Sequence, residues 1–266
     1  MSDAAAGQVS IEAAELYEEF FVPALFDQWP ARLLELAGVA EGDRVLDVGC
    51  GSGVVARAAR RAVGRSGAVT GVDPNDGMLA VASGVEPGVT WIEGVAEDLP
   101  IETATMDRVI CQFALMFCTD RARALAELAR VTRPGGTVVV ATWAELDASP
   151  GYAAMVDLLR EVAGDEPADA LLAPFSVGTE SALHELMVET FPGVEVRRWD
   201  GNARFPSVLD WLDTDIKAWT LAPLISDDAY DTLRVRAPRD LVQFCDPDGS
   251  VRFPTPALVA HAVLAH

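Results

Sequence analysis

Three glycines after a short apolar segment constrain the fold of this chain more than any other feature. Val45–Val48 is followed by Gly49, Gly51 and Gly53, and residues 54–62 then have the spacing of a helix. Glycine adopts the backbone angles of a sharp turn and lets a ligand approach the main chain closely. The helix behind such a turn presents unpaired N–H groups and the positive end of its dipole. The sequence therefore predicts a strand, a turn and a helix, with a ligand site or a tight structural turn at the glycines.

Strand-like and helix-like segments alternate through the first half of the chain. Alternation of this kind is typical of parallel strands with helices on both faces of the sheet. Ligands of such open sheets bind beyond the carboxyl ends of the strands. We therefore expect an α/β protein with a Rossmann-like, seven-stranded, mostly parallel sheet. The first five strands are predicted at 44–48, 67–72, 89–92, 106–111 and 137–142.

The segments on either side of this core are predicted to be largely helical. A helix from Ile11 to Phe21 should be interrupted at Pro23, with a second helix over about 24–37. We expect three regions in one compact chain: a helical cap (1–40), a ligand-binding core (41–145), and a third region (146–266) that completes the sheet around a helical insertion. In this third region helices are predicted at 149–163, 179–191, 207–219 and 226–244, an acidic loop at 164–174, and strands of the main sheet at 194–199, 251–253 and 257–263.

Composition narrows the class of protein. Half of the 266 residues are hydrophobic, which allows a large core, yet no apolar run approaches the roughly 20 residues that span a bilayer. The first residues have neither the basic nor the apolar region of a secretory signal. The four cysteines form no C-x-x-C pair. These features favour a reduced, cytoplasmic protein without disulfides or a structural metal site.

The charge balance bears on the partners. The net charge is −21, and Lys217 is the only lysine. Such a surface repels nucleic acid phosphates and anionic membranes. We therefore expect a small-molecule substrate, with no nucleic acid partner and no membrane insertion. The oligomeric state is left open between monomer and homodimer.

The motifs together resemble a known enzyme family. Asp47, Gly49, Gly51 and Gly53 match motif I of class I S-adenosylmethionine-dependent methyltransferases, in which an acidic residue precedes G-x-G-x-G. Residues 107–117 look like motif IV, and 124–136 resemble the helix and Pro-Gly-Gly turn that precede the family's fifth strand. The chain is most similar to small-molecule enzymes of the ubiquinone/menaquinone-biosynthesis type. The resemblance implies S-adenosyl-L-methionine as cofactor, S-adenosyl-L-homocysteine as its product, and a methyltransferase activity (EC 2.1.1).

Some cofactor-binding residues follow from this resemblance. Asp73 ends the second strand, where a carboxylate accepts hydrogen bonds from a ribose diol. Met78 is the candidate for covering the adenine face, and Val95 departs from the family pattern because it offers no side-chain acceptor. Tyr17 and Trp29 are expected either to face the ligands or to pack the cap. The full predicted cofactor-binding set is Asp47, Gly49, Cys50, Gly51, Asp73, Pro74, Met78, Val95, Ala96, Glu97, Gln112, Phe113, Tyr17 and Trp29.

The sequence nominates no catalytic residue. His184 falls in an amphipathic helix, and no cluster has metal-ligand spacing. The insertion contains four aromatic residues, Phe205, Trp211, Trp219 and Phe244. They either favour an apolar or aromatic substrate, methylated at an O, C or N atom, or simply pack the inserted helices together.

Two alternatives to a methyltransferase stay open. One is a nicotinamide-dependent oxidoreductase, which the spacing disfavours because Val54 stands where G-x-G-x-x-G has its third glycine. The other is a cofactor-binding protein with a non-methylating role in natural-product synthesis.

Overall fold

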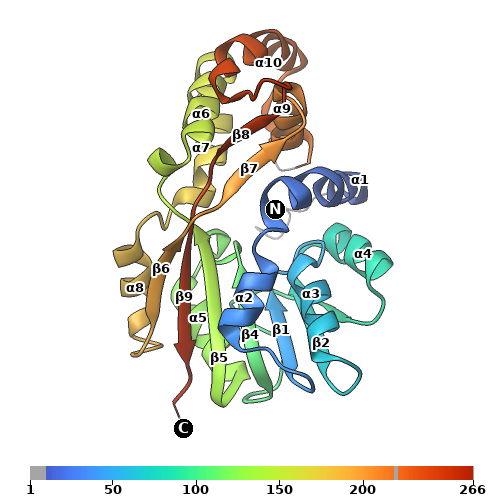
Figure 1. The fold of residues 1–266 in the computed structure, drawn as a ribbon, viewed down its shortest axis with the longest axis vertical. Coiled ribbons are helices and arrows are strands. Elements are labelled where there is room, and N and C mark those ends of the chain that lie inside the picture. The colour runs from blue at the N-terminus through green and yellow to red at the C-terminus, as the bar shows by residue number, and fades with distance from the viewer. Residues whose placement is uncertain (1–9, 219–220, 266) are drawn as a thin grey trace.

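A seven-stranded sheet forms the centre of the protein in a computed structural model, which describes residues 10–218 and 221–265. The strand order is β3-β2-β1-β4-β5-β9-β6. The first five strands pair in parallel, and β9 runs antiparallel between β5 and β6. The predicted α/β fold is therefore confirmed (Figure 1). The strands are β1 (Arg44–Val48), β2 (Ala68–Asp73), β3 (Thr90–Glu93), β4 (Met106–Gln112), β5 (Thr132–Trp143), β6 (Glu195–Trp199) and β9 (Ala257–Val263).

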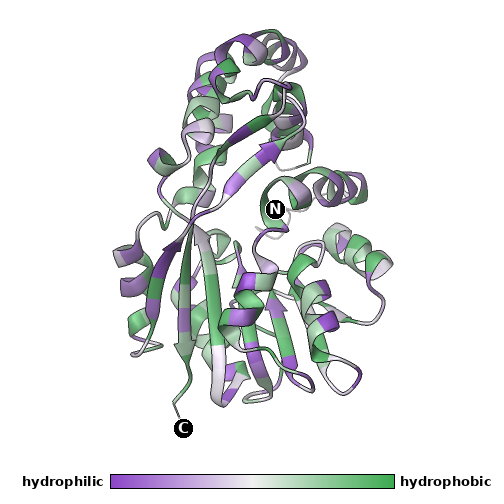
Figure 2. Cartoon of the chain, viewed as in Figure 1, coloured by the Kyte–Doolittle hydropathy of each residue, from purple (hydrophilic) through white to green (hydrophobic). Residues whose placement is uncertain are grey.

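The central strands are mainly apolar because helices cover both faces of the sheet. Helices α2 (Pro30–Ala37) and α3 (Val54–Val63) contact each other and lie against one side of the central strands. Helices α5 (Arg121–Val131) and α8 (Glu180–Val188) contact each other and pack on β5, β9 and β6. Figure 2 shows hydrophobic residues gathered in the central strands, whereas β6 at the sheet edge is largely hydrophilic.

The fifth strand starts earlier than predicted. β5 begins at Thr132, so the Arg133–Gly136 turn belongs to its irregular first part, where the register with β4 shifts between Met106 and Arg108. Gly135 has a φ of +74° there. The glycines thus let the strand bend into the sheet, and the turn and the strand merge.

The cap consists of α1 (Ile11–Leu16) and the π-helical stretch η2 (Tyr17–Phe26). The prediction that Pro23 interrupts this helix, with a second helix from about residue 24, is wrong. The chain stays helical through Pro23 because the wider π turns use other donors, and the Asp27 N–H bonds to the Val22 carbonyl at 2.9 Å. The second helix, α2, starts only at Pro30, where a missing N–H costs nothing.

The inserted residues form a separate group of elements, here called the lobe. It contains α6 (Pro150–Ala163), α7 (Asp165–Leu172), α9 (Val208–Lys217), α10 (Asp227–Asp240) and the two-stranded ribbon of β7 (Asn202–Phe205) and β8 (Val251–Pro254). Figure 1 shows the lobe beyond the end of the sheet at which β1 and β5 terminate, with the cap beside it. The cap stretch η2 contacts both β7 and α9.

Two predictions for the lobe are wrong. The segment 164–174 is mostly the helix α7, since acidic Asp165 and Glu166 favour a helix N-terminus and Ala168 and Leu171 bury one face. The strand at 251–253 pairs with β7 and not with the main sheet, because Pro254 and Pro256 separate it from β9. Trp219, one of the predicted lobe aromatics, lies outside the described residues. In the described part of the chain no helix has the length and apolar character to cross a membrane.

Candidate functional site

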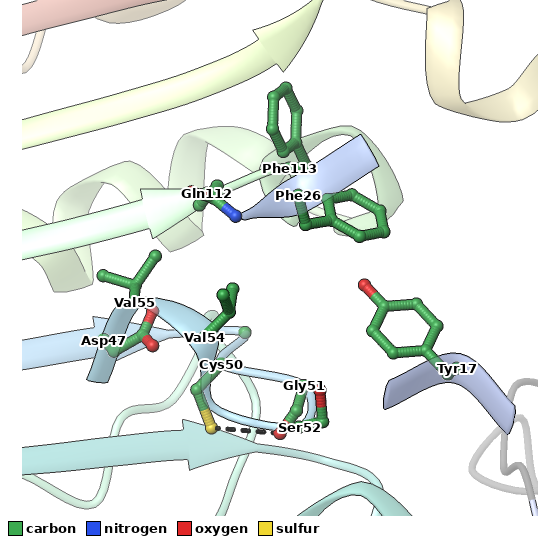
Figure 3. Close-up of a pocket in the computed structure, with 11 residues that line it drawn as sticks. Tyr17, Phe26, Asp47, Cys50, Gly51, Ser52, Val54, Val55, Gln112 and Phe113 are labelled. Carbon is green, nitrogen blue, oxygen red and sulfur yellow. Dashed lines mark hydrogen bonds between the residues drawn. The ribbon is translucent and has the colours of Figure 1, made fainter. Parts of the chain in front are cut away.

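A hollow of about 360 Å³, open space included, lies where β1 and β4 end, and we call it the turn hollow (Figure 3). Its walls come from the glycine turn, the start of α3, the end of β4 and the cap. Predicted site residues supply most of this lining. The lining residues are Tyr17, Phe26, Asp47, Gly49, Cys50, Gly51, Ser52, Val54, Val55, Gln112 and Phe113.

The glycine turn is fixed by contacts that only glycine allows. Gly49 has a φ of +65°, and a Cβ atom there would stand 2.2 Å from the Cβ of Ala114. Gly53 has a φ of +89°, and its Cβ would stand 2.4 Å from the Trp91 ring. The N–H of Gly49 donates to the Val72 carbonyl at 2.8 Å, which ties the turn to β2. The turn therefore holds bare backbone at the floor of the hollow.

Two buried carboxyl groups support this floor. Asp47 is 1% exposed and accepts a hydrogen bond of 2.9 Å from the Ala56 N–H near the start of α3. Burial raises the pKa of the Asp47 carboxyl to about 7, and the charge of Asp73 adds to the rise. Asp73 accepts from the N–H of Gly51 at 2.8 Å, and burial raises its pKa as well. The paired carboxyls favour a ligand with positive charge.

The cap closes one side of the hollow. The Tyr17 ring packs on Phe26 with 5.3 Å between centroids, and Figure 3 shows its hydroxyl directed toward that ring. Burial and the nearby Asp73 charge raise the pKa of Tyr17, so the hydroxyl stays protonated at neutral pH. Beside it, Arg57 of α3 forms a salt bridge of 2.7 Å with Glu18 and donates to the Ser52 carbonyl at 2.7 Å. One arginine thus fastens the cap to the glycine turn.

The end of β4 supplies the opposite wall. The Gln112 side chain is buried, and its Oε1 has no hydrogen-bond partner among the described residues. Phe113 has a φ of +54°, which is rare for a bulky residue. Its ring stacks on Trp143 with centroids 3.7 Å apart and planes within 9°. An unpaired buried acceptor and a strained neighbour at one wall are typical of a ligand site.

The remaining predicted residues lie outside the turn hollow. Met78 sits in the first turn of α4 (Asp76–Val85), where its N–H donates to the Asn75 side chain at 3.0 Å. The loop after β3 adjoins the end of β2, since the Gly94 N–H bonds to the Asp73 carbonyl at 3.2 Å. Pro74 and Val95 are exposed, and Ala96 is partly buried. Their predicted contacts with an adenosine group stay predictions.

Two of the predicted residues have evident structural partners. Glu97 accepts from the N–H of Thr119 at 2.9 Å and so braces the loop after β4. Trp29 is fully buried, donates from Nε1 to the Leu25 carbonyl at 2.8 Å, and packs edge-on against Phe113. Trp29 therefore supports the wall from behind and does not line the hollow.

Sequence reasoning missed four lining residues. Ser52, Val54 and Val55 belong to the glycine turn and its helix, and the motif's spacing, which treats intervening residues as variable, gave no sign of their contact. Phe26 was not predicted, because the helix expected over 24–37 gave no reason to direct its side chain toward the glycine turn. The Oγ of Ser52, like Gln112 Oε1, has no partner in the described residues.

Known proteins resemble the chain over this same core. Residues 46–140 match the family model of the methyltransferase domain. The malonyl-[acyl-carrier protein] O-methyltransferase of Serratia marcescens is 34% identical over 160 residues, 59% of this chain and 60% of that protein. The ubiquinone/menaquinone biosynthesis C-methyltransferase of Psychromonas ingrahamii is 34% identical over 118 residues, 42% of this chain and 47% of that protein. The matches thus span about half of these relatives' own length.

The fold extends the likeness beyond the matched segment. The structure of Haemonchus contortus phosphoethanolamine N-methyltransferase 2, in complex with S-adenosyl-L-methionine, superposes with a TM-score of 0.60 at 20% identity. It covers 97% of this chain and 58% of the other. The sheet order, the glycine turn and the matched segment agree: over residues 46–140 the chain is similar to the methyltransferase domain, and these likenesses support a class I S-adenosylmethionine-dependent methyltransferase similar to those of ubiquinone and menaquinone biosynthesis.

Proposed function

We propose that the protein transfers a methyl group from S-adenosyl-L-methionine to a small, apolar or aromatic molecule, and that it works as a reduced, cytoplasmic enzyme. The observation that carries the proposal is the turn hollow, where buried carboxyls and unpartnered acceptors meet the family's glycine turn. No described feature favours a nicotinamide enzyme or a non-methylating role.

The residues of the turn hollow fit this cofactor. Its methionine end carries an ammonium group and a sulfonium, and both are cationic. Asp47 supplies a buried carboxyl, while Gln112 and Ser52 supply acceptor oxygens that lack protein partners. Asp73, at the end of β2 beside the loop after β3, is placed for the ribose and adenine end. The donor and acceptor types therefore agree with the ligand that the family uses.

The protein itself positions the two reactants and excludes water from them. Bound S-adenosyl-L-methionine supplies an activated methyl group whose transfer leaves a neutral thioether, so the protein needs no acid for the leaving group. Tyr17, Phe26 and Phe113 surround the hollow with aromatic rings that keep water out. Positioning of two reactants supplies roughly 7–11 kcal/mol of the barrier reduction. Fixed walls, including the strained Phe113, serve this positioning.

Calorimetric titration of the purified protein tests the proposal. We expect binding of S-adenosyl-L-methionine and S-adenosyl-L-homocysteine, and none of NAD. Asp47→Asn should weaken S-adenosyl-L-methionine binding about tenfold or more, since it removes one charge-assisted interaction. Glu35→Gln, on the exposed side of α2, is the matched control and should bind like the wild type. Binding of NAD alone, or of neither cofactor, would overturn the proposal.

A further inference from the structure

A second hollow lies where the lobe, the cap and the end of β5 meet, and we call it the lobe hollow. It measures about 290 Å³, open space included. Four aromatic side chains from different elements line it, namely Phe26, Trp143, Tyr152 and Phe175. Aliphatic side chains complete the apolar lining.

One acidic residue interrupts this apolar lining. Asp215 of α9 is 1% exposed, and neither of its carboxyl oxygens has a hydrogen-bond partner within the described chain. Trp211, one helical turn earlier, also has a buried Nε1 without a partner. A buried polar group without a partner is costly, and native proteins rarely keep one without a use.

The neighbours of Asp215 do not remove this cost. Burial raises the pKa of its carboxyl well above the ordinary value, and the Trp211 indole and Tyr152 hydroxyl beside it offset the rise only in part. Both act on the carboxyl as hydrogen-bond donors, but neither meets the distance and angle of a full hydrogen bond to its oxygens. The carboxyl oxygens therefore keep acceptor capacity that these two neighbours do not fill.

Another acid on the same helix shows the contrast. Asp213, two residues earlier, receives hydrogen bonds of 2.6 Å from Arg234 and 2.6 Å from the Tyr230 hydroxyl. It is the acid that stabilises the lobe by joining α9 to α10. Asp215 has no ion pair of this kind, and its oxygens stay unsatisfied, so an anchoring role like that of Asp213 does not explain it.

The lobe hollow adjoins the turn hollow. Phe26 lines both. Phe113 lines the turn hollow and stacks on Trp143, which lines the lobe hollow. The two hollows are therefore neighbours whose linings meet at Phe26, Phe113 and Trp143.

From these observations we propose that the lobe hollow binds the acceptor substrate, a small aromatic or aliphatic molecule that is apolar except for one hydrogen-bond donor. Its hydroxyl or amine group donates to the Asp215 carboxyl, and the four rings contact its apolar body. The assignment of this molecule as methyl acceptor rests on the proposed function. The binding site itself does not, because it follows from the lining and the unpaired carboxyl.

The test compares simple probes that differ in the donor. Dissociation constants of phenol, benzylamine and toluene are measured by ligand-observed NMR on the wild type and on Asp215→Leu. We expect phenol or benzylamine to bind the wild type about tenfold more tightly than toluene, the size of one hydrogen bond to a charged or buried partner. In Asp215→Leu this preference should vanish. Phenol against benzylamine identifies the donor as hydroxyl or amine.

Controls keep the test decisive. Asp231→Leu makes the same substitution at an exposed site on α10 and should keep the preference. Asp215→Asn, nearly identical in shape, replaces the leucine variant if that variant does not fold, and it should lose any preference for benzylamine over toluene. Equal binding of all probes to the wild type, or a preference that survives in Asp215→Leu, would overturn the inference.

Calorimetry with S-adenosyl-L-methionine on the same samples separates the two proposals. If the cofactor binds and the donor preference is absent, the lobe hollow is wrongly assigned and the proposed function stands. If the preference is present and the cofactor does not bind, the proposed function fails and the small-molecule site remains.

Discussion

The fold buries the carboxyl group of Asp47 and so removes the water that would solvate its charge. Asp47 lies at the end of a central strand, is 1% exposed, and has a pKa raised to about 7 by burial. The Ala56 N–H lowers that pKa, but does not cancel the effect of burial. At the residue scale, burial of this carboxyl therefore lowers the free energy of unfolding of the protein, and such a local cost is typical of functional sites.

The titration of Asp47 predicts how stability varies with pH. Its pKa is higher in the folded than in the unfolded protein, so its stabilising contribution is complete below about pH 4 and is lost as the pH rises through about 7. We expect Asp47→Asn to gain up to about 4 kcal/mol over the wild type between pH 4 and pH 8. Urea unfolding at a series of pH values measures the difference, and Glu35→Gln should show none. A difference between Asp47→Asn and the wild type that does not change with pH would contradict the assignment.

Two glycines with nearly equal backbone angles test the floor of the turn hollow. Gly49 and Gly38 have φ values of +65° and +66°, but a Cβ atom meets Ala114 only at Gly49 and nothing within 4 Å at Gly38. Gly38→Ala should cost about 1–2 kcal/mol for the left-handed conformation alone. Gly49→Ala should cost a further 1–3 kcal/mol, since overpacking adds to the strain. Equal losses of unfolding free energy for the two variants would show that the turn relaxes.

At the scale of elements, the cap is held by buried aromatic side chains and by one arginine. Arg57 joins α3, the glycine turn and the cap through Glu18 and the Ser52 carbonyl. A partly buried arginine–carboxylate pair of this kind is worth more than an exposed one. The position of the cap therefore depends in part on this one side chain.

Removal of this arginine should loosen the cap. We expect Arg57→Met to weaken S-adenosyl-L-methionine binding about tenfold, from the loss of one charge-assisted contact, and to speed proteolysis within residues 11–26. Arg61→Met changes an exposed arginine on the same helix and is the control. Unchanged affinity and unchanged proteolysis in Arg57→Met would mean that ring packing of Tyr17 on Phe26 holds the cap by itself.

The elements that sequence patterns predicted are those whose signals are local. The strand before Gly49 and the helix after Gly53 are predicted by the alternation of apolar runs and turn residues. Pro23 misled because its local effect is to break an α-helix, whereas the fold there is π-helical. The strand at 251–253 misled because pairing partners are set by tertiary structure, which a short apolar run does not encode.

The two hollows differ in the same way. The glycine turn and its neighbours lie within a few residues of one another, so a motif indicates most of the turn hollow. The lobe hollow takes Phe26, Trp143, Tyr152, Phe175 and Asp215 from distant parts of the chain. Nothing in the sequence around Asp215 distinguishes it from Asp213, since only the packing of α9 decides which of the two is buried.

At the scale of the whole molecule, charge opposes compactness. The chain carries a net charge of −21, and its arginines are largely engaged in ion pairs or carbonyl contacts in the described structure. The excess carboxylates therefore repel one another, an effect that salt screens over about 10 Å at 0.1 M ionic strength.

Salt should therefore stabilise the protein. We expect the midpoint of thermal unfolding to rise by several degrees, roughly 1–2 kcal/mol, between 0.05 M and 0.5 M sodium chloride. Potassium chloride at equal ionic strength should act alike, which separates screening from specific ion binding. A midpoint that falls with salt would mean that ion pairs outweigh the repulsion.

Phe26 belongs to the walls of both hollows. Whatever displacement of this ring one ligand requires is therefore imposed on the other ligand's surroundings too. Thermodynamic linkage makes such coupling reciprocal: the factor by which the first ligand alters the affinity of the second is the factor by which the second alters the first. For the two ligands proposed above, a single side chain of the cap therefore links the occupancy of one hollow to the affinity of the other.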